Sequence, residues 1–94
     1  MREELSVCEA PIMKIIWESN PDISVPELVK QLNEQYGKEY ARTTVVTFLT
    51  RMAGKGYITT QRRGRISYVH AIKSEQEYKQ QLAQKEIEFW FHGS

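Results

Sequence analysis

The spacing of apolar residues along this chain changes near residue 57. Before that point, apolar side chains recur every three or four residues in three successive segments; after it come two short runs rich in β-forming residues, the second of which alternates. A period of 3.6 residues gives a one-sided helix, whereas a period of two gives a one-sided strand. The order of elements is therefore three helices followed by a β-hairpin, within a single domain of 94 residues.

The first helix is expected between about Ser6 and Ser19. Residues Ser6 to Glu9 have the S-x-x-E form of a capping box. Pro11 would fall beyond the first turn of a helix capped at Ser6, where its missing N–H costs a hydrogen bond, so we expect either a distorted start or a late one near Cys8. Its apolar stripe consists of Ile12, Met13, Ile16 and Trp17.

The second helix is predicted from the capping box at Ser24–Glu27 to Gly37, a residue type that commonly ends helices. Pro26 is tolerated in the first turn. One continuous apolar face comprises Val25, Leu28, Val29, Leu32 and Tyr36.

Residues 42–55 are rich in Thr and Val, which favour strands by propensity. The spacing favours a helix instead, because the apolar residues fall at i, i+3, i+4 and i+7. These residues are Val45, Phe48, Leu49 and Met52. Gly54 and Gly56 close the segment.

Two runs rich in β-forming residues, 57–61 and 66–72, predict the strands of the hairpin, and Gly64 supplies the positive φ that its tight turn needs. In the second strand we expect one packed face, which makes His70 a packed histidine rather than a ligand. That face comprises Ile66, Tyr68, His70 and Ile72. A third capping box, Ser74–Glu77, opens a last helix.

These elements predict a fold that is mainly α with a small antiparallel β-hairpin, in the order of a winged helix-turn-helix: a three-helix core, a wing and a C-terminal helix. We expect the winged-helix domain to span residues 1–73 and a C-terminal helix to span 74–94. The last helix carries Phe89, Trp90 and Phe91 close to its end. Such a cluster fits either the start of a dimerisation region or a helix docked on the core.

The formal net charge of +1 hides an uneven distribution. Residues 1–37 carry a net charge of −4, residues 38–73 a net charge of +7, and residues 74–94 a net charge of −2. A basic middle between acidic flanks is typical of a nucleic-acid contact surface. The alternative is an ordinary solvated face.

The exposed face of helix 42–55 is the first candidate contact surface. Opposite the buried stripe lie Thr43, Val46, Thr47 and Thr50. Short hydroxyl side chains can approach base edges, and a methyl-bearing side chain can meet the methyl group of thymine. An ordinary exposed helix face would favour Glu, Lys and Gln. Cations along this segment are placed to meet phosphates or a guanine edge: Arg42, Arg51 and Lys55.

The hairpin tip is the second candidate, because it carries Arg62, Arg63 and Arg65 within four residues. Like charges this close repel one another unless an anionic partner is present. Phosphates or a minor groove would supply that partner. A tip that only protects the sheet edge is the alternative.

Nothing in the sequence predicts an enzyme, a metal site or a cofactor. Cys8 has no second cysteine, and no His, Cys and carboxylate residues have metal-ligand spacing. No apolar run is long enough for a membrane span, and the lone cysteine suits a reducing cytoplasm. The competing function is a winged-helix module whose basic face binds an acidic protein.

Three groups of residues resemble the penicillinase repressor family, the winged-helix repressors of the BlaI, MecI and CopY type. They are Glu9…Ile12-Met13…Trp17, then Thr43-Thr44-Val45…Thr47…Leu49…Arg51-Met52…Lys55-Gly56-Tyr57-Ile58, and finally Gly64-Arg65…Tyr68. The resemblance covers nearly the whole chain. Pro11 and Val46 depart from the family's usual residues, the first at the start of helix one and the second in the base-reading face.

The resemblance implies a transcriptional repressor that binds a palindromic operator in double-stranded DNA as a homodimer. The family's recognition helix would correspond to Thr43, Thr44, Thr47 and Arg51, and its wing to Arg62, Arg63 and Arg65. Family members continue into a helical region that dimerises and senses the inducing signal. We therefore expect those two functions largely outside residues 1–94.

Overall fold

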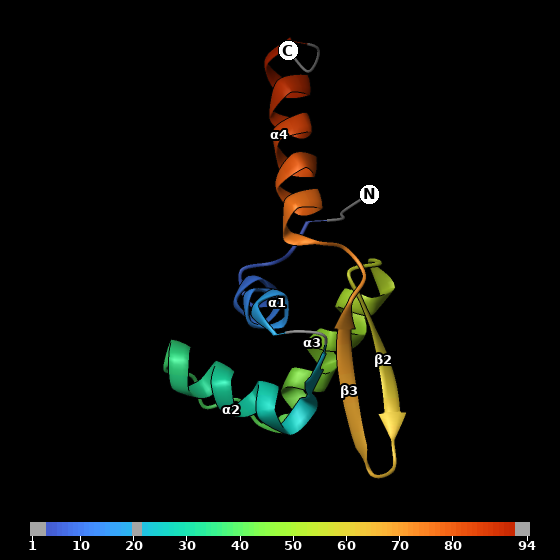
Figure 1. Ribbon diagram of the computed structural model, residues 1–94. Coiled ribbons are helices and arrows are strands. Elements are labelled where there is room, and N and C mark those ends of the chain that lie inside the picture. Colours follow the sequence, from blue (N-terminus) through green and yellow to red (C-terminus); the bar gives the residue numbers. More distant parts are fainter. Residues whose placement is uncertain (1–3, 20–21, 92–94) are drawn as a thin grey trace.

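The computed structural model describes residues 4–19 and 22–91, with side chains through Gln84. It confirms a fold that is mainly α with a small antiparallel sheet, in the predicted order of elements (Figure 1). The elements are α1 (Glu9–Glu18), β1 (Ile23–Ser24), α2 (Val25–Tyr36), α3 (Arg42–Gly54), β2 (Ile58–Arg63), β3 (Ile66–Ala71) and α4 (Glu75–Phe91). In the described residues, no helix is long and apolar enough to span a bilayer.

At the start of α1, the capping box forms and Pro11 is still accommodated in the first turn. The box forms, because the Ser6 N–H donates to Glu9 Oε1 at 2.9 Å and the Glu9 N–H donates to Ser6 Oγ at 3.2 Å. The helix itself begins at Glu9, so Pro11 lies in the first turn, where its missing N–H costs nothing. Of the two predicted starts, distorted or late, the structure has the late one.

The core lies where α1, α2 and α3 meet one face of the sheet (Figure 1). Each helix buries most of the stripe that its spacing predicts, but Tyr36, expected on the apolar face of α2, is exposed. The side chains at its centre are fully buried: Ile12, Met13, Leu28, Leu32, Val45, Met52, Tyr57 and Val69.

The sheet has three strands in the order β1-β3-β2, one more than the sequence predicts. Ile23 pairs with Val69 and Ser24 with Tyr68, so β1 ties the start of α2 to the hairpin. A strand of two residues shows no alternation, which is why the spacing of apolar residues could not reveal it.

The predicted packed face of the second hairpin strand is wrong. Val69 is the fully buried residue of β3, whereas Ile66, His70 and Ile72 are exposed. The pairing of β1 with β3 explains the difference, since Ile23 lies opposite Val69 and places that side chain against the helices. A shift of one residue exchanges the two faces of a strand.

Helix α4 extends away from the rest of the molecule (Figure 1), and the described side chains that fasten it to the domain lie in its first two turns. The ring of Tyr78 packs against Trp17 and Tyr57, at centroid distances of 5.8 and 5.6 Å, and its hydroxyl accepts the Leu5 N–H at 3.2 Å. The Trp17 indole N–H donates to the Lys73 carbonyl at 2.8 Å. The predicted aromatic cluster at 89–91 lies outside the described side chains.

Candidate nucleic-acid interface

The outer face of α3 carries the polar and methyl-bearing side chains that the sequence predicts there. Val45, Leu49 and Met52 are buried against the core, so the opposite side of the helix is turned to solvent. The exposed candidates are Arg42, Thr43, Thr44, Val46, Thr47, Thr50 and Arg51. Val46 is 42% exposed, an unusual position for a β-branched apolar side chain on a helix.

Two threonines on this face have fixed hydroxyl groups. Thr47 Oγ1 donates to the Thr43 carbonyl and Thr50 Oγ1 to the Val46 carbonyl, both at 3.0 Å. Each hydroxyl proton is therefore used within the helix, while the oxygen keeps a lone pair and the methyl group a fixed direction. Such a surface can accept a hydrogen bond from a base amine and contact a thymine methyl group.

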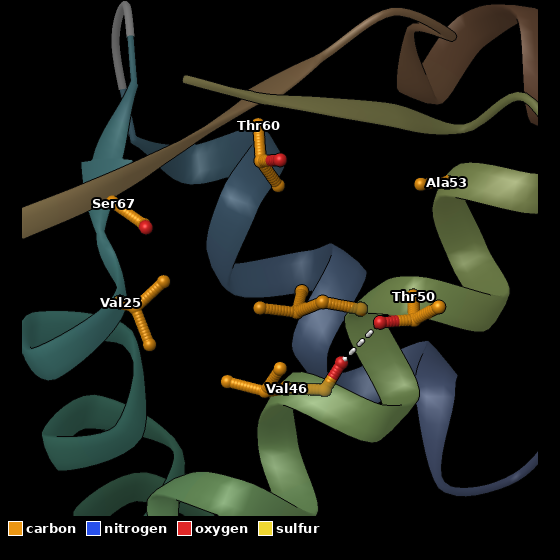
Figure 2. A pocket seen from close by; sticks show the side chains of 7 residues that line it. Val25, Val46, Thr50, Ala53, Thr60 and Ser67 are labelled. Carbon is orange, nitrogen blue, oxygen red and sulfur yellow. Dashed lines mark hydrogen bonds between the residues drawn. The ribbon is translucent and has the colours of Figure 1, made fainter. Parts of the chain in front are cut away.

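A groove separates α3 from the hairpin, and we call it the α3–hairpin groove (Figure 2). It encloses about 310 Å³. Figure 2 shows Val46, Thr50 and Ala53 on the helix side, with Thr60 and Ser67 facing them from the strands. The full lining comprises Val25, Val46, Leu49, Thr50, Ala53, Thr60 and Ser67.

The strand register divides the arginines of the hairpin between two faces. Residues paired across antiparallel strands lie on the same face, so Thr60 beside Val69 and Arg62 beside Ser67 belong to the α3-facing side. Arg63 therefore lies on the opposite side. The three arginines do not form one cluster.

Arg63 already has partners inside the domain. Its Nη2 lies 2.6 Å from Asp22 Oδ2, and its guanidinium lies 4.6 Å from the centre of the Tyr68 ring. Arg62 Nε donates to the Gly64 carbonyl at 3.1 Å, and no carboxylate among the described residues pairs with its charge.

Arg65 and Arg42 meet at a smaller hollow at the outer end of the groove. This hollow, the Arg42–Arg65 hollow, encloses about 90 Å³. Its lining comprises Val25, Pro26, Arg42, Val46, Arg65, Ile66 and Ser67. The hollow brings a cation from the start of α3 next to a cation from the hairpin, and so joins the two predicted contact elements into one basic surface.

Lys55, the remaining predicted contact residue, is engaged inside the domain. Its Nζ lies 2.7 Å from Glu9 Oε1 and donates to the Glu4 carbonyl at 3.0 Å. Burial raises the pKa of Glu9, but hydrogen bonds from Lys55 and Ser6 and the charge of Lys55 outweigh it and hold the pKa below its ordinary value. Lys55 therefore neutralises a buried carboxylate.

Within the part of the chain that the structure describes, no three metal-ligating side chains gather. Cys8 is exposed, and its Sγ lies 3.9 Å from the Tyr40 hydroxyl, which is no catalytic arrangement by itself.

Three surface residues that border this interface were not among the predicted contacts: Thr60, Ser67 and Ile66. The sequence shows them as strand residues. Only the register reveals that Thr60 and Ser67 face α3, whereas Ile66 lies on the opposite face beside Arg63.

Comparisons with known proteins agree with this geometry. The family model described as "Penicillinase repressor" matches residues 5–94. The chain is also similar to the solution structure of the DNA binding domain of the repressor BlaI, with a TM-score of 0.68 and 26% identity, over 81% of this chain and 89% of that one. No curated protein matches. Because the family model covers nearly the whole chain, the protein belongs to the penicillinase repressor family.

Proposed function

We propose that this chain is the DNA-binding part of a transcriptional repressor, with α3 in the major groove and the hairpin on the adjacent backbone or minor groove. One observation carries the proposal: the Arg42–Arg65 hollow joins the exposed face of α3 to Arg65 of the hairpin. A helix of short side chains beside a basic wing is the arrangement that winged helix-turn-helix proteins use to read duplex DNA.

The side chains divide into two roles. We assign the reading of base edges to Thr43, Thr44, Val46, Thr47 and Thr50, which are short enough to approach the bases. We assign phosphate contacts to Arg42, Arg51, Arg62 and Arg65, which have no carboxylate partner among the described residues. Arg63 would contact either Asp22 or a DNA phosphate. We assign no DNA contact to Lys55, because it pairs with Glu9.

The assembly that we propose is a homodimer on a palindromic operator, because two-fold symmetry in a protein matches two-fold symmetry in its site. Residues 1–73 would read one half-site and residues 74–94 would begin the dimerisation region. The similar BlaI structure is described as a DNA binding domain of a repressor, which supports the DNA partner. A reducing cytoplasm suits the exposed thiol of Cys8.

The test uses a duplex selected by this chain from a random library, together with a random-sequence duplex. We expect Thr47→Ala to weaken binding to the selected duplex about tenfold and to leave binding to the random duplex nearly unchanged, because a base contact discriminates by about 1–3 kcal/mol. The matched control is Thr59→Ala, an exposed threonine on the hairpin face that points away from α3.

No binding of the wild-type chain to any duplex at low salt would overturn the proposal and favour an acidic protein partner. Equal losses on both duplexes for Thr47→Ala would overturn the base-reading role of this face.

A further inference from the structure

We propose that the α3–hairpin groove holds one sugar–phosphate strand of the DNA, and that Thr60 and Ser67 hydrogen-bond to its phosphates. This inference rests on the proposed function and adds residues to it. The groove is lined by α3 on one side and by β2 and β3 on the other (Figure 2).

The shape of duplex DNA leads to this assignment. A single sugar–phosphate strand separates a major groove from the neighbouring minor groove. If α3 enters the major groove and the hairpin reaches the minor-groove side, that strand must pass between the two elements. The α3–hairpin groove is the space between them.

The walls of the groove suit a sugar–phosphate strand. Ser67 and Thr60 offer hydroxyl groups, and within the described part of the chain neither hydroxyl donates to a protein acceptor. Val46 and Ala53 offer methyl groups to the apolar side of a deoxyribose. Hydroxyl side chains are common phosphate ligands in protein–DNA contacts.

Charge is complementary at the outer end of the groove. Arg62 lies beside Ser67 on the α3-facing side of the hairpin, and Arg42 and Arg65 border the adjoining hollow. No described acidic side chain lines either cavity. An anionic strand would therefore meet cations where it enters, and neutral hydroxyl groups deeper in.

The groove depends on small side chains. Ala53 on the helix and Ser67 on the strand leave open a space that a larger residue at either position would fill. Ala53 is exposed on α3, so a larger apolar residue there can be accommodated without disturbing the core.

The first test combines Thr60→Val with Ser67→Ala, which removes both hydroxyl groups and no charge. We expect binding to weaken by roughly tenfold or more on both the selected and the random duplex, because each lost bond is to a charged phosphate. The dependence of affinity on salt should stay the same, since no cation is removed. Thr59→Val, on the opposite face of β2, is the matched control.

The second test replaces single phosphates of the selected duplex by neutral methylphosphonates. The wild-type chain should lose affinity when the phosphate in the groove is neutralised, and the double variant should lose much less at that position. Ala53→Leu should weaken binding to both duplexes, because its side chain occupies the space of the strand.

Two results would overturn the inference while leaving the proposed function intact. One is a double variant that binds DNA as the wild type does, with the same methylphosphonate pattern. The other is an Ala53→Leu variant with unchanged affinity, which would leave the groove to some other occupant. If the wild-type chain binds no duplex, the proposed function itself fails.

Discussion

Glu9 shows how a single side chain fixes the position of two helices. Its carboxylate is 1% exposed, and it accepts hydrogen bonds from the Ser6 N–H and from Lys55 Nζ. Lys55 follows the last turn of α3, so the pair joins the start of α1 to the end of the proposed recognition helix. A buried carboxylate without such a cation would be strongly destabilising.

Glu9→Gln should lower the free energy of unfolding by about 2 kcal/mol at neutral pH, because it leaves a partly buried ammonium group without its charged partner. The pKa of Glu9 is lowered in the folded state, so the stabilisation is complete above the unfolded pKa of about 4.3 and is lost as the pH falls through the folded value. The difference between wild type and variant should therefore narrow below about pH 4. Urea unfolding at several pH values measures it.

Glu75→Gln is the matched control for that experiment. Glu75 pairs with Lys14 at 3.0 Å on the surface, where solvent screens the interaction. We expect little change in stability. A Glu9→Gln variant as stable as the wild type at pH 7 would show that the buried pair contributes nothing.

At the scale of elements, the sequence predicts the helices far better than the sheet. Capping boxes and a period of 3.6 residues locate α1, α2, α3 and the start of α4, because both signals are local. The faces of β3 depend instead on β1, which is distant in sequence and only two residues long. The exposed face of α3 follows from the local spacing of apolar residues and was therefore predictable. The separation of Arg62 from Arg63 depends on the strand register, which was not.

The contact between β1 and the hairpin also reduces the positive charge that the wing presents to DNA. Asp22 lies directly before β1, and its Oδ2 is 2.6 Å from Arg63 Nη2. The side chain of Arg63 is 48% exposed. Asp22→Asn should release this arginine and tighten binding to a random duplex about two- to fivefold, the effect of a surface ion pair. A released Arg63 that contacts one phosphate should also steepen the slope of log K against log salt by about 0.9.

The double variant Asp22→Asn with Arg63→Gln separates the two possible causes. If Arg63 is responsible, the added Arg63→Gln change should cancel the gain. A gain that survives in the double variant would instead reflect only the loss of the negative charge of Asp22.

At the scale of the whole molecule, acidic and basic residues are concentrated in different elements. The acidic residues lie mainly in the segments of α1, α2 and α4, while the net charge of residues 38–73 is +7. This arrangement attracts an anionic partner to one side of the domain even though the net charge is only +1.

Binding to a random duplex should therefore depend steeply on salt. Four arginines without carboxylate partners among the described residues would each displace counterions from one phosphate, which gives a slope of about −3.6 per domain for log K against log salt. Titration by fluorescence anisotropy between 50 and 200 mM salt, roughly the range over which such slopes are measured, tests the value. A slope near zero would contradict a phosphate-contacting surface.

The attachment of α4 through Tyr78 has a mechanical consequence for any dimer formed through this helix. Seventeen residues at about 1.5 Å each make an arm of about 25 Å, held to the domain near one end. A tilt of about 10° at the attached end would move the far end by about 4 Å, close to the rise of one base pair. The contacts in the first two turns of α4, with the Tyr78 ring among them, would then set the angle of this arm and so the distance between the two half-sites of such a dimer.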